Sequence, residues 1–155
     1  LCFYRVFYFL GCCGILPAFM KQELSLYTFS IVCGIFFLNG LAHRFGWYEG
    51  YWWFDNLMHA LGGLFVAFLG AQIVMNKQLK GSLSRSLLFF VFTIGVLWEA
   101  YEYGVQLFFP FETIAAPLDS LQDLALDMFG GVIGIYFVSL LQTKYNRKNG
   151  EQKNT

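Results

Sequence analysis

Five long stretches of apolar side chains, with few charges inside them, dominate this sequence. They run approximately over Leu1–Met20, Leu24–Ala42, Phe54–Met75, Leu83–Phe109 and Leu118–Leu141. Each is close to the ~20 residues that an α-helix needs to cross the hydrocarbon core of a bilayer. The sequence therefore predicts an all-α fold, a polytopic transmembrane helical bundle of about five spanning helices. We expect a single bundle over residues 1–142 and a polar cytoplasmic tail over residues 143–155.

The composition agrees with a membrane protein, since 57% of the residues are apolar and only 13% are charged. A soluble domain carries about a quarter charged residues. Ten basic and ten acidic residues cancel, so the balance of charge gives no sign of nucleic-acid binding. The first apolar stretch contains Arg5, and a signal peptide is an alternative interpretation of it. Because no small-x-small cleavage site follows and Cys12 and Cys13 continue the apolar run, we favour a retained helix.

The basic residues predict how the helices are oriented. The loop after the third stretch carries Lys77, Lys80 and Arg85 without an acid, and the tail is also mainly basic. The loop before the fifth stretch holds Glu112 and Asp119 and no base. Since Lys and Arg concentrate in cytoplasmic loops, the amino terminus is expected outside and the carboxyl terminus in the cytoplasm. This pattern is typical of a multi-pass membrane protein.

Thiol labelling tests this orientation. In a variant without the four native cysteines, a Cys at Ser82 should resist an impermeant thiol reagent in intact cells, because its loop is cytoplasmic. A Cys at Ala115 should react. The opposite labelling pattern would invert the topology.

Aromatic residues crowd the segment between the second and third stretches. They are Trp47, Tyr48, Tyr51, Trp52 and Trp53. Such rings sit at headgroup depth and anchor a helix at the interface. An aromatic wall of a lipid-headgroup site is the alternative.

Ionisable side chains also occur inside the apolar stretches, although each costs at least ~2.5 kcal/mol to insert. They form three groups spaced by three or four residues, so each group shares one face of its helix. The groups are Asp55 with His59, Glu99 with Glu102, and Asp119 with Asp123 and Asp127. The orientation places all three groups in the outward half of the bilayer, so we expect one site there.

Several carboxylates in a low-dielectric environment cannot all stay ionised without a cation or shared protons. A bound divalent metal ion, Mg²⁺, Mn²⁺ or Zn²⁺, is the simplest way to offset the repulsion among these carboxylates, because carboxylate and imidazole groups bind these ions. The candidate metal ligands are Asp55, His59, Glu99, Glu102, Asp123 and Asp127. His59 and Glu99 are also the candidate catalytic groups, as acid or base. Alternatively, protonation of some carboxylates would offset the repulsion, and the cluster would then be a proton or cation relay.

Simpler interpretations of these residues stay open. Asp55 and Asp119 each lie near the start of an apolar run, where a carboxylate can cap a helix. His59 and the deeper acids could instead link helices by hydrogen bonds. Gly130 and Gly134 form a small-x-x-x-small face that lets two helix backbones approach, and we expect only packing from them.

Three segments together resemble a known family. Asp55-Asn-Leu-Met-His59, Glu99-Ala-Tyr-Glu102 and Asp123-Leu-Ala-Leu-Asp127-Met-Phe-Gly130 resemble the YjdF-like family of uncharacterised bacterial inner-membrane proteins. More distantly, the chain looks like the VanZ-like proteins, and the resemblance covers about residues 40–142. The VanZ-like pattern tends to have Lys, Gln and Asn where this chain has Asn56, Glu102 and Asp127, which favours the YjdF-like family. The resemblance implies a multi-pass helical bundle but no settled reaction.

Three functions fit these observations. The first is a metal-dependent membrane hydrolase or phosphotransferase that acts on a lipid or lipid-linked phosphate at the outer leaflet. The second is a proton- or cation-coupled transporter, and the third is a non-catalytic protein whose polar cluster is structural. The expected partners are membrane lipids, a lipid-linked substrate and a second copy of the chain, and nucleic acid is not expected.

Overall fold

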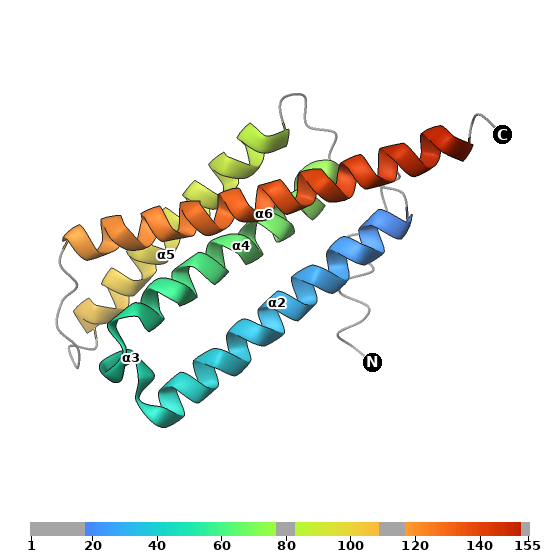
Figure 1. The fold of residues 1–155 in the computed structure, drawn as a ribbon. Helices are drawn as coiled ribbons and strands as arrows, with labels where there is room; N and C mark the ends of the chain where they lie inside the picture. The colour runs from blue at the N-terminus through green and yellow to red at the C-terminus, as the bar shows by residue number, and fades with distance from the viewer. Residues whose placement is uncertain (1–17, 77–82, 109–116, 153–155) are drawn as a thin grey trace.

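The computed structural model describes residues 18–76, 83–108 and 117–152, and all regular elements in these ranges are helices (Figure 1). They are α2 (Ala18–Phe45), α3 (Trp47–Gly50), α4 (Trp52–Asn76), α5 (Leu83–Phe108) and α6 (Pro117–Gln152). Residues 1–17, which make up most of the first expected helix, lie outside the described residues. The loop residues Lys77, Lys80 and Glu112 used to predict the orientation also lie outside them.

Four of the described helices are long and apolar enough to cross a membrane, which confirms the predicted all-α membrane fold for this part of the chain. The candidate spans are Gln22–Phe45, Trp52–Ile73, Leu83–Phe108 and Asp119–Lys144. The helix boundaries differ from the expected ones in α6, which continues to Gln152, and in α2, which begins at Ala18, inside the first expected stretch. A helix can extend past the hydrocarbon core because its backbone hydrogen bonds are internal.

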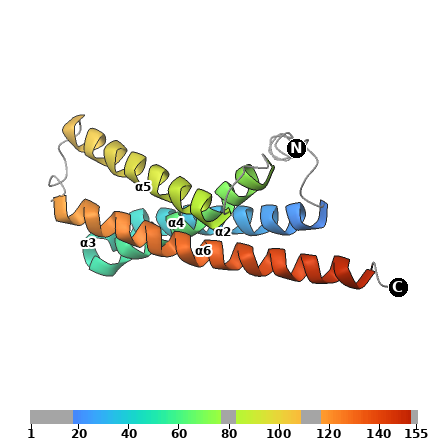
Figure 2. The same ribbon diagram turned by 90° about the horizontal axis from the view of Figure 1, so that it is seen from above.

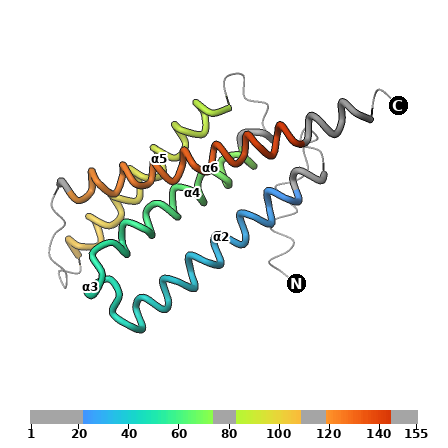
Figure 3. Tube along the Cα trace, in the orientation of Figure 1, coloured from blue at the N-terminus to red at the C-terminus, as the bar shows by residue number. Residues whose placement is uncertain are grey.

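Helix α4 lies at the centre of the bundle and packs most extensively against α6. Helix α2 runs beside α4 at the outside of the bundle (Figures 1 and 3). Helix α5 crosses the others at an angle and moves away from α6 toward its carboxyl end (Figure 2). Helices α2 and α5 end, and α4 and α6 begin, at the end of the bundle where α3 lies (Figure 1). We call this the α3 end.

Glycines allow α4 and α6 to meet at their backbones. A Cβ atom at Gly63 would overlap the backbone carbonyl of Asp127, and one at Gly130 would overlap the backbone carbonyl of Ala60. A Cβ atom at Gly134 would lie 2.7 Å from that of Ala67. This confirms the close approach expected from the small-residue face. Because lipid tails give apolar helices no hydrophobic reason to associate, such close packing is a main source of cohesion.

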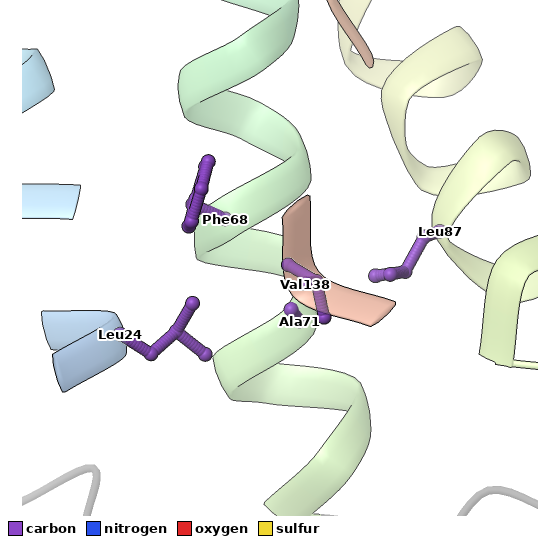
Figure 4. Packing of buried hydrophobic residues seen from close by; sticks show 5 residues of the cluster. All are labelled: Leu24, Phe68, Ala71, Leu87 and Val138. Carbon is purple, nitrogen blue, oxygen red and sulfur yellow. The ribbon is translucent and has the colours of Figure 1, made fainter. Parts of the chain in front are cut away.

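Away from the α3 end, four helices contribute to an apolar cluster (Figure 4). Its buried members are Leu24, Phe68, Ala71, Leu87 and Val138. Beside it, the Gln72 amide donates a 2.6 Å hydrogen bond to the Thr28 hydroxyl, which itself donates to the Leu24 carbonyl. A hydrogen-bonded polar link between α2 and α4 therefore lies beside the apolar cluster.

The aromatic segment folds into the short helix α3, which the sequence pattern did not predict. Gly46 precedes it with φ of 65°, a left-handed conformation that favours glycine. The rings of Trp47 and Tyr48 pack edge-on against Phe54, which is buried at the start of α4. The turn thus fixes how α4 enters the bundle.

Candidate metal centre

The imidazole of His59 lies among four carboxylates that come from three helices. On one side of the ring, Nε2 is 4.0 Å from Asp55 Oδ2 and 3.9 Å from Asp123 Oδ1. On the other side, Nδ1 is 3.4 Å from Asp127 Oδ1 and 3.9 Å from Glu99 Oε1. Groups separated by as many as 72 residues in the sequence are therefore brought into one cluster, which we call the His59 cluster.

Helical spacing positions these side chains. Asp55 and His59 lie one turn apart on α4, Asp123 and Asp127 lie one turn apart on α6, and α5 supplies Glu99. Capping does not explain the acids near the helix starts, because α4 begins at Trp52 and α6 at Pro117. Asp55 and Asp119 instead lie within the first turns, where the helix dipole favours a negative charge.

The cluster is buried at its centre and open on one side. His59 and Asp127 are each 7% exposed and Asp123 is 5% exposed. The Asp55 side chain, in contrast, is 49% exposed. Among the described residues, Glu99 Oε1 and Asp123 Oδ1 are buried without a hydrogen-bond partner. A buried polar atom without a partner is costly, so these two oxygens indicate room for a ligand.

Other residues from the predicted set do not reach the imidazole. Glu102 accepts a 2.7 Å hydrogen bond from the Trp98 indole, and it lies one turn further along α5, toward the end that moves away from α6. Asp119 is exposed. His43, the other histidine of the chain, was not among the candidate ligands; it is exposed and packs its ring against Tyr48. The described structure thus brings together Asp55, His59, Glu99, Asp123 and Asp127.

The pattern of charged residues did not identify several neighbours of the cluster. Gln122 donates a 3.0 Å hydrogen bond to Asn56, which ties α6 to α4 next to the acids. Gly95 faces the Asp127 side chain, so a Cβ atom there would lie 3.0 Å from Oδ2. Gln122 and Gly95 lie in helices that the sequence predicted. Hydrophobic periodicity, however, does not show which residues of different helices are in contact.

Tyr48 lies outside the spanning segments, and nearby acids affect the pKa of its hydroxyl. Burial raises the pKa of its hydroxyl, and the charges of Asp55 and Glu102 raise that pKa further. The hydroxyl therefore stays protonated and donates a 2.8 Å hydrogen bond to Asn39.

Two sets of three side chains have the geometry to hold a metal ion, and both include His59. One set is Asp55, His59 and Asp123, and the other is His59, Glu99 and Asp127. In each set the three potential ligand atoms lie within 4.8 Å of one another. No described Lys or Arg forms an ion pair with these acids. The charge and the donor atoms of these two sets would suit a divalent cation.

Comparison with known proteins agrees with the membrane fold. An uncharacterised protein of Thermotoga maritima is 26% identical over 135 residues, which cover 83% of this chain and 67% of that protein. No solved structure matches the chain. Residues 6–144 match the model of a family described as "Predicted membrane protein (DUF2238)", and this range includes the whole His59 cluster. The chain therefore belongs to the DUF2238 family of predicted membrane proteins.

Proposed function

We propose that this multi-pass membrane protein binds a divalent metal ion at the His59 cluster and uses it on a lipid or lipid-linked phosphate. The observation that carries the proposal is the position of His59, within 4.0 Å of four carboxylates inside a helical bundle. The donor set is one imidazole with carboxylate oxygens, which suits Mn²⁺ or Zn²⁺ and, through the carboxylates alone, Mg²⁺. Two buried oxygens without partners support a bound ion.

The depth of the cluster supports a lipid substrate. His59 lies six and seven residues after Trp53 and Trp52 on α4, or about 10 Å along the helix axis. Since Trp side chains prefer headgroup depth, the cluster would lie just below the headgroups. The phosphate of a lipid can reach this depth while its tail stays in the bilayer. Asp55, half exposed, lies on the accessible side.

The residues of the cluster can divide the chemistry of phosphate hydrolysis or transfer among them. A bound metal ion would supply the positive charge that the acids lack and would polarise a phosphoryl oxygen or a water molecule. Glu99 can accept a proton from the attacking group, because its Oε1 is buried and has no hydrogen-bond partner in the described structure. His59 would serve as a metal ligand or as the acid or base, but one nitrogen cannot do both.

Metal analysis and a phosphate-release assay test the proposal. We expect detergent-purified protein to hold a divalent metal in stoichiometric amount and to release phosphate from phosphatidic acid or polyprenyl phosphate in vesicles. His59→Gln, which removes the residue that both metal sets share, should lose the metal and the activity. Asp119→Asn, an exposed acid on the same stripe of α6, should keep both. Metal-free wild-type protein would contradict the proposal.

Transport is the competing function, and the described structure gives it less support. The half of the bundle away from the α3 end contains the apolar cluster and the Thr28–Gln72 link. Glu23 on α2 is a carboxylate in that half, but the apolar cluster lies between it and the His59 cluster along the bundle. If vesicles containing the protein showed ion-driven flux without phosphate release, transport would replace the lipid-phosphate proposal. A polar cluster with neither metal nor activity would leave the structural role.

The setting of this function is also part of the proposal. The basic loops and the YjdF-like resemblance support the bacterial inner membrane, with the cluster toward the outer leaflet. Lipids would be the immediate partners. Exposed aromatic side chains occur around α5, among them Phe89, Phe92, Trp98 and Tyr101, and lipid tails or a second copy of the chain would cover them.

A further inference from the structure

The two metal-binding sets compete for one imidazole. A neutral histidine has one nitrogen with a lone pair and one with a proton, so it can bind a metal ion on only one side. Histidines that bind metals usually donate the other N–H to a carboxylate, which fixes the ring. The question is therefore which side of His59 holds the ion and which side is held by an acid.

The surroundings of Asp127 favour an orienting role. Its Oδ1 is 3.4 Å from Nδ1, the shortest of the four distances around the ring. Glycines from two other helices enclose the same carboxylate. A Cβ at Gly62 would lie 3.8 Å from Oδ1, and one at Gly95 would lie 3.0 Å from Oδ2. Both oxygens thus face helix backbones or the imidazole, which leaves little room for an ion and its waters.

The Nε2 side offers what an ion requires. Asp55 Oδ2 and Asp123 Oδ1 lie at nearly equal distances from Nε2, 4.0 and 3.9 Å, too long for hydrogen bonds and wide enough to admit a cation. The Asp123 side chain is only 7% exposed, and its Oδ1 has no hydrogen-bond partner among the described residues. The exposure of Asp55 leaves positions around the ion accessible to water or substrate, as catalytic metal sites require.

Resting on the proposed metal function, we infer that the ion binds to Nε2 of His59 together with Asp55 and Asp123. Asp127 is then a positioning residue: its carboxylate accepts a hydrogen bond from Nδ1–H and holds the ring. Glu99 Oε1 lies 3.9 Å from Nδ1, on the protonated side of the ring, so Glu99 is not a ligand of this ion. The aspartates one turn apart on α6 therefore have different roles, although their spacing makes them look equivalent.

Nuclear magnetic resonance with ¹¹³Cd²⁺ and ¹⁵N-labelled histidine tests the assignment. The chain has two histidines, so His43→Gln leaves the His59 ring as the one labelled group. We expect ¹¹³Cd–¹⁵N coupling at Nε2, recognised by its correlations to both ring carbon-bound protons, while Nδ1 keeps its proton. Coupling at Nδ1, or at both nitrogens, would overturn this assignment and leave the metal function intact. The absence of any response to Cd²⁺ would overturn both.

Two amide variants separate a ligand from a positioning residue. Asp123→Asn should abolish the coupling. Asp127→Asn should retain coupling at Nε2 with Cd²⁺ affinity lowered about 10–100-fold, and its Nδ1 proton should exchange faster because the acceptor is weaker. Equal losses in both variants, or an unchanged Nδ1 signal in Asp127→Asn, would contradict the separate roles.

Discussion

Gly130→Ala should destabilise the protein by about 3 kcal/mol, the upper end of the usual cost of overpacking, since the added methyl group would overlap the backbone carbonyl of Ala60. Backbone atoms cannot turn away as a flexible side chain can, so α4 and α6 would have to separate. Gly63→Ala should act similarly through the carbonyl of Asp127, directly beside the His59 cluster. We expect both variants to melt at lower temperature in detergent and to lose bound metal.

The matched controls are glycines in other parts of the spanning helices. A Cβ atom at Gly40 or Gly104 would meet no atom within 4 Å. Gly40→Ala and Gly104→Ala should therefore leave the melting temperature unchanged or raise it slightly, since alanine favours helix by roughly 1 kcal/mol over glycine. If Gly130→Ala had the same melting temperature as Gly104→Ala, this would contradict the close contact between the backbones of α4 and α6.

Chelation should lower the melting temperature of the wild-type protein by roughly 5–10 °C, because a bound ion present at a hundredfold excess over its Kd adds about 2.7 kcal/mol. Asp123→Asn should abolish this response. Without metal, however, the amide variant should be as stable as the wild type or more stable, since it removes one charge from the crowded acids. Thermal unfolding in detergent with and without chelator measures all these effects.

Asp119→Asn serves as the control, because Asp119 lies one turn before Asp123 on α6 but is exposed. It should respond to chelator as the wild type does. If melting of the wild type did not change with chelator, the metal function would lose its main support. Asp123→Asn should then melt close to the wild type under both conditions, as expected of a carboxylate that only links helices.

Much of the fold could be predicted from the sequence because the bilayer requires long apolar helices with internal hydrogen bonds. The spans over α2, α4 and α5 were located to within a few residues. The helix α3 was not predicted, since its four residues carry no periodic signal and depend on the left-handed turn at Gly46. The extension of α6 to Gln152 was also missed, because hydropathy reports where the apolar core ends and not where a helix ends.

The members of the His59 cluster were identifiable from the sequence because a charged group inside an apolar helix is costly and therefore stands out. Spacing placed Asp55 with His59 and Asp123 with Asp127 on shared faces. Spacing could not show that Glu102 would bond Trp98 while Glu99 would face the imidazole, since both lie on the same helix three residues apart. That difference depends on how α5 crosses α4 and α6.

The sequence by itself thus determined the all-helical membrane fold, the close glycine contact and the residues available for a site. The tertiary structure decided which of those residues meet, because contact depends on the crossing of helices distant in sequence. It enclosed Asp127 between glycines of α4 and α5, and it left Asp123 Oδ1 buried without a partner. Asp123 and Asp127 lie on the same face of α6 but have different surroundings. Packing against the neighbouring helices creates that difference.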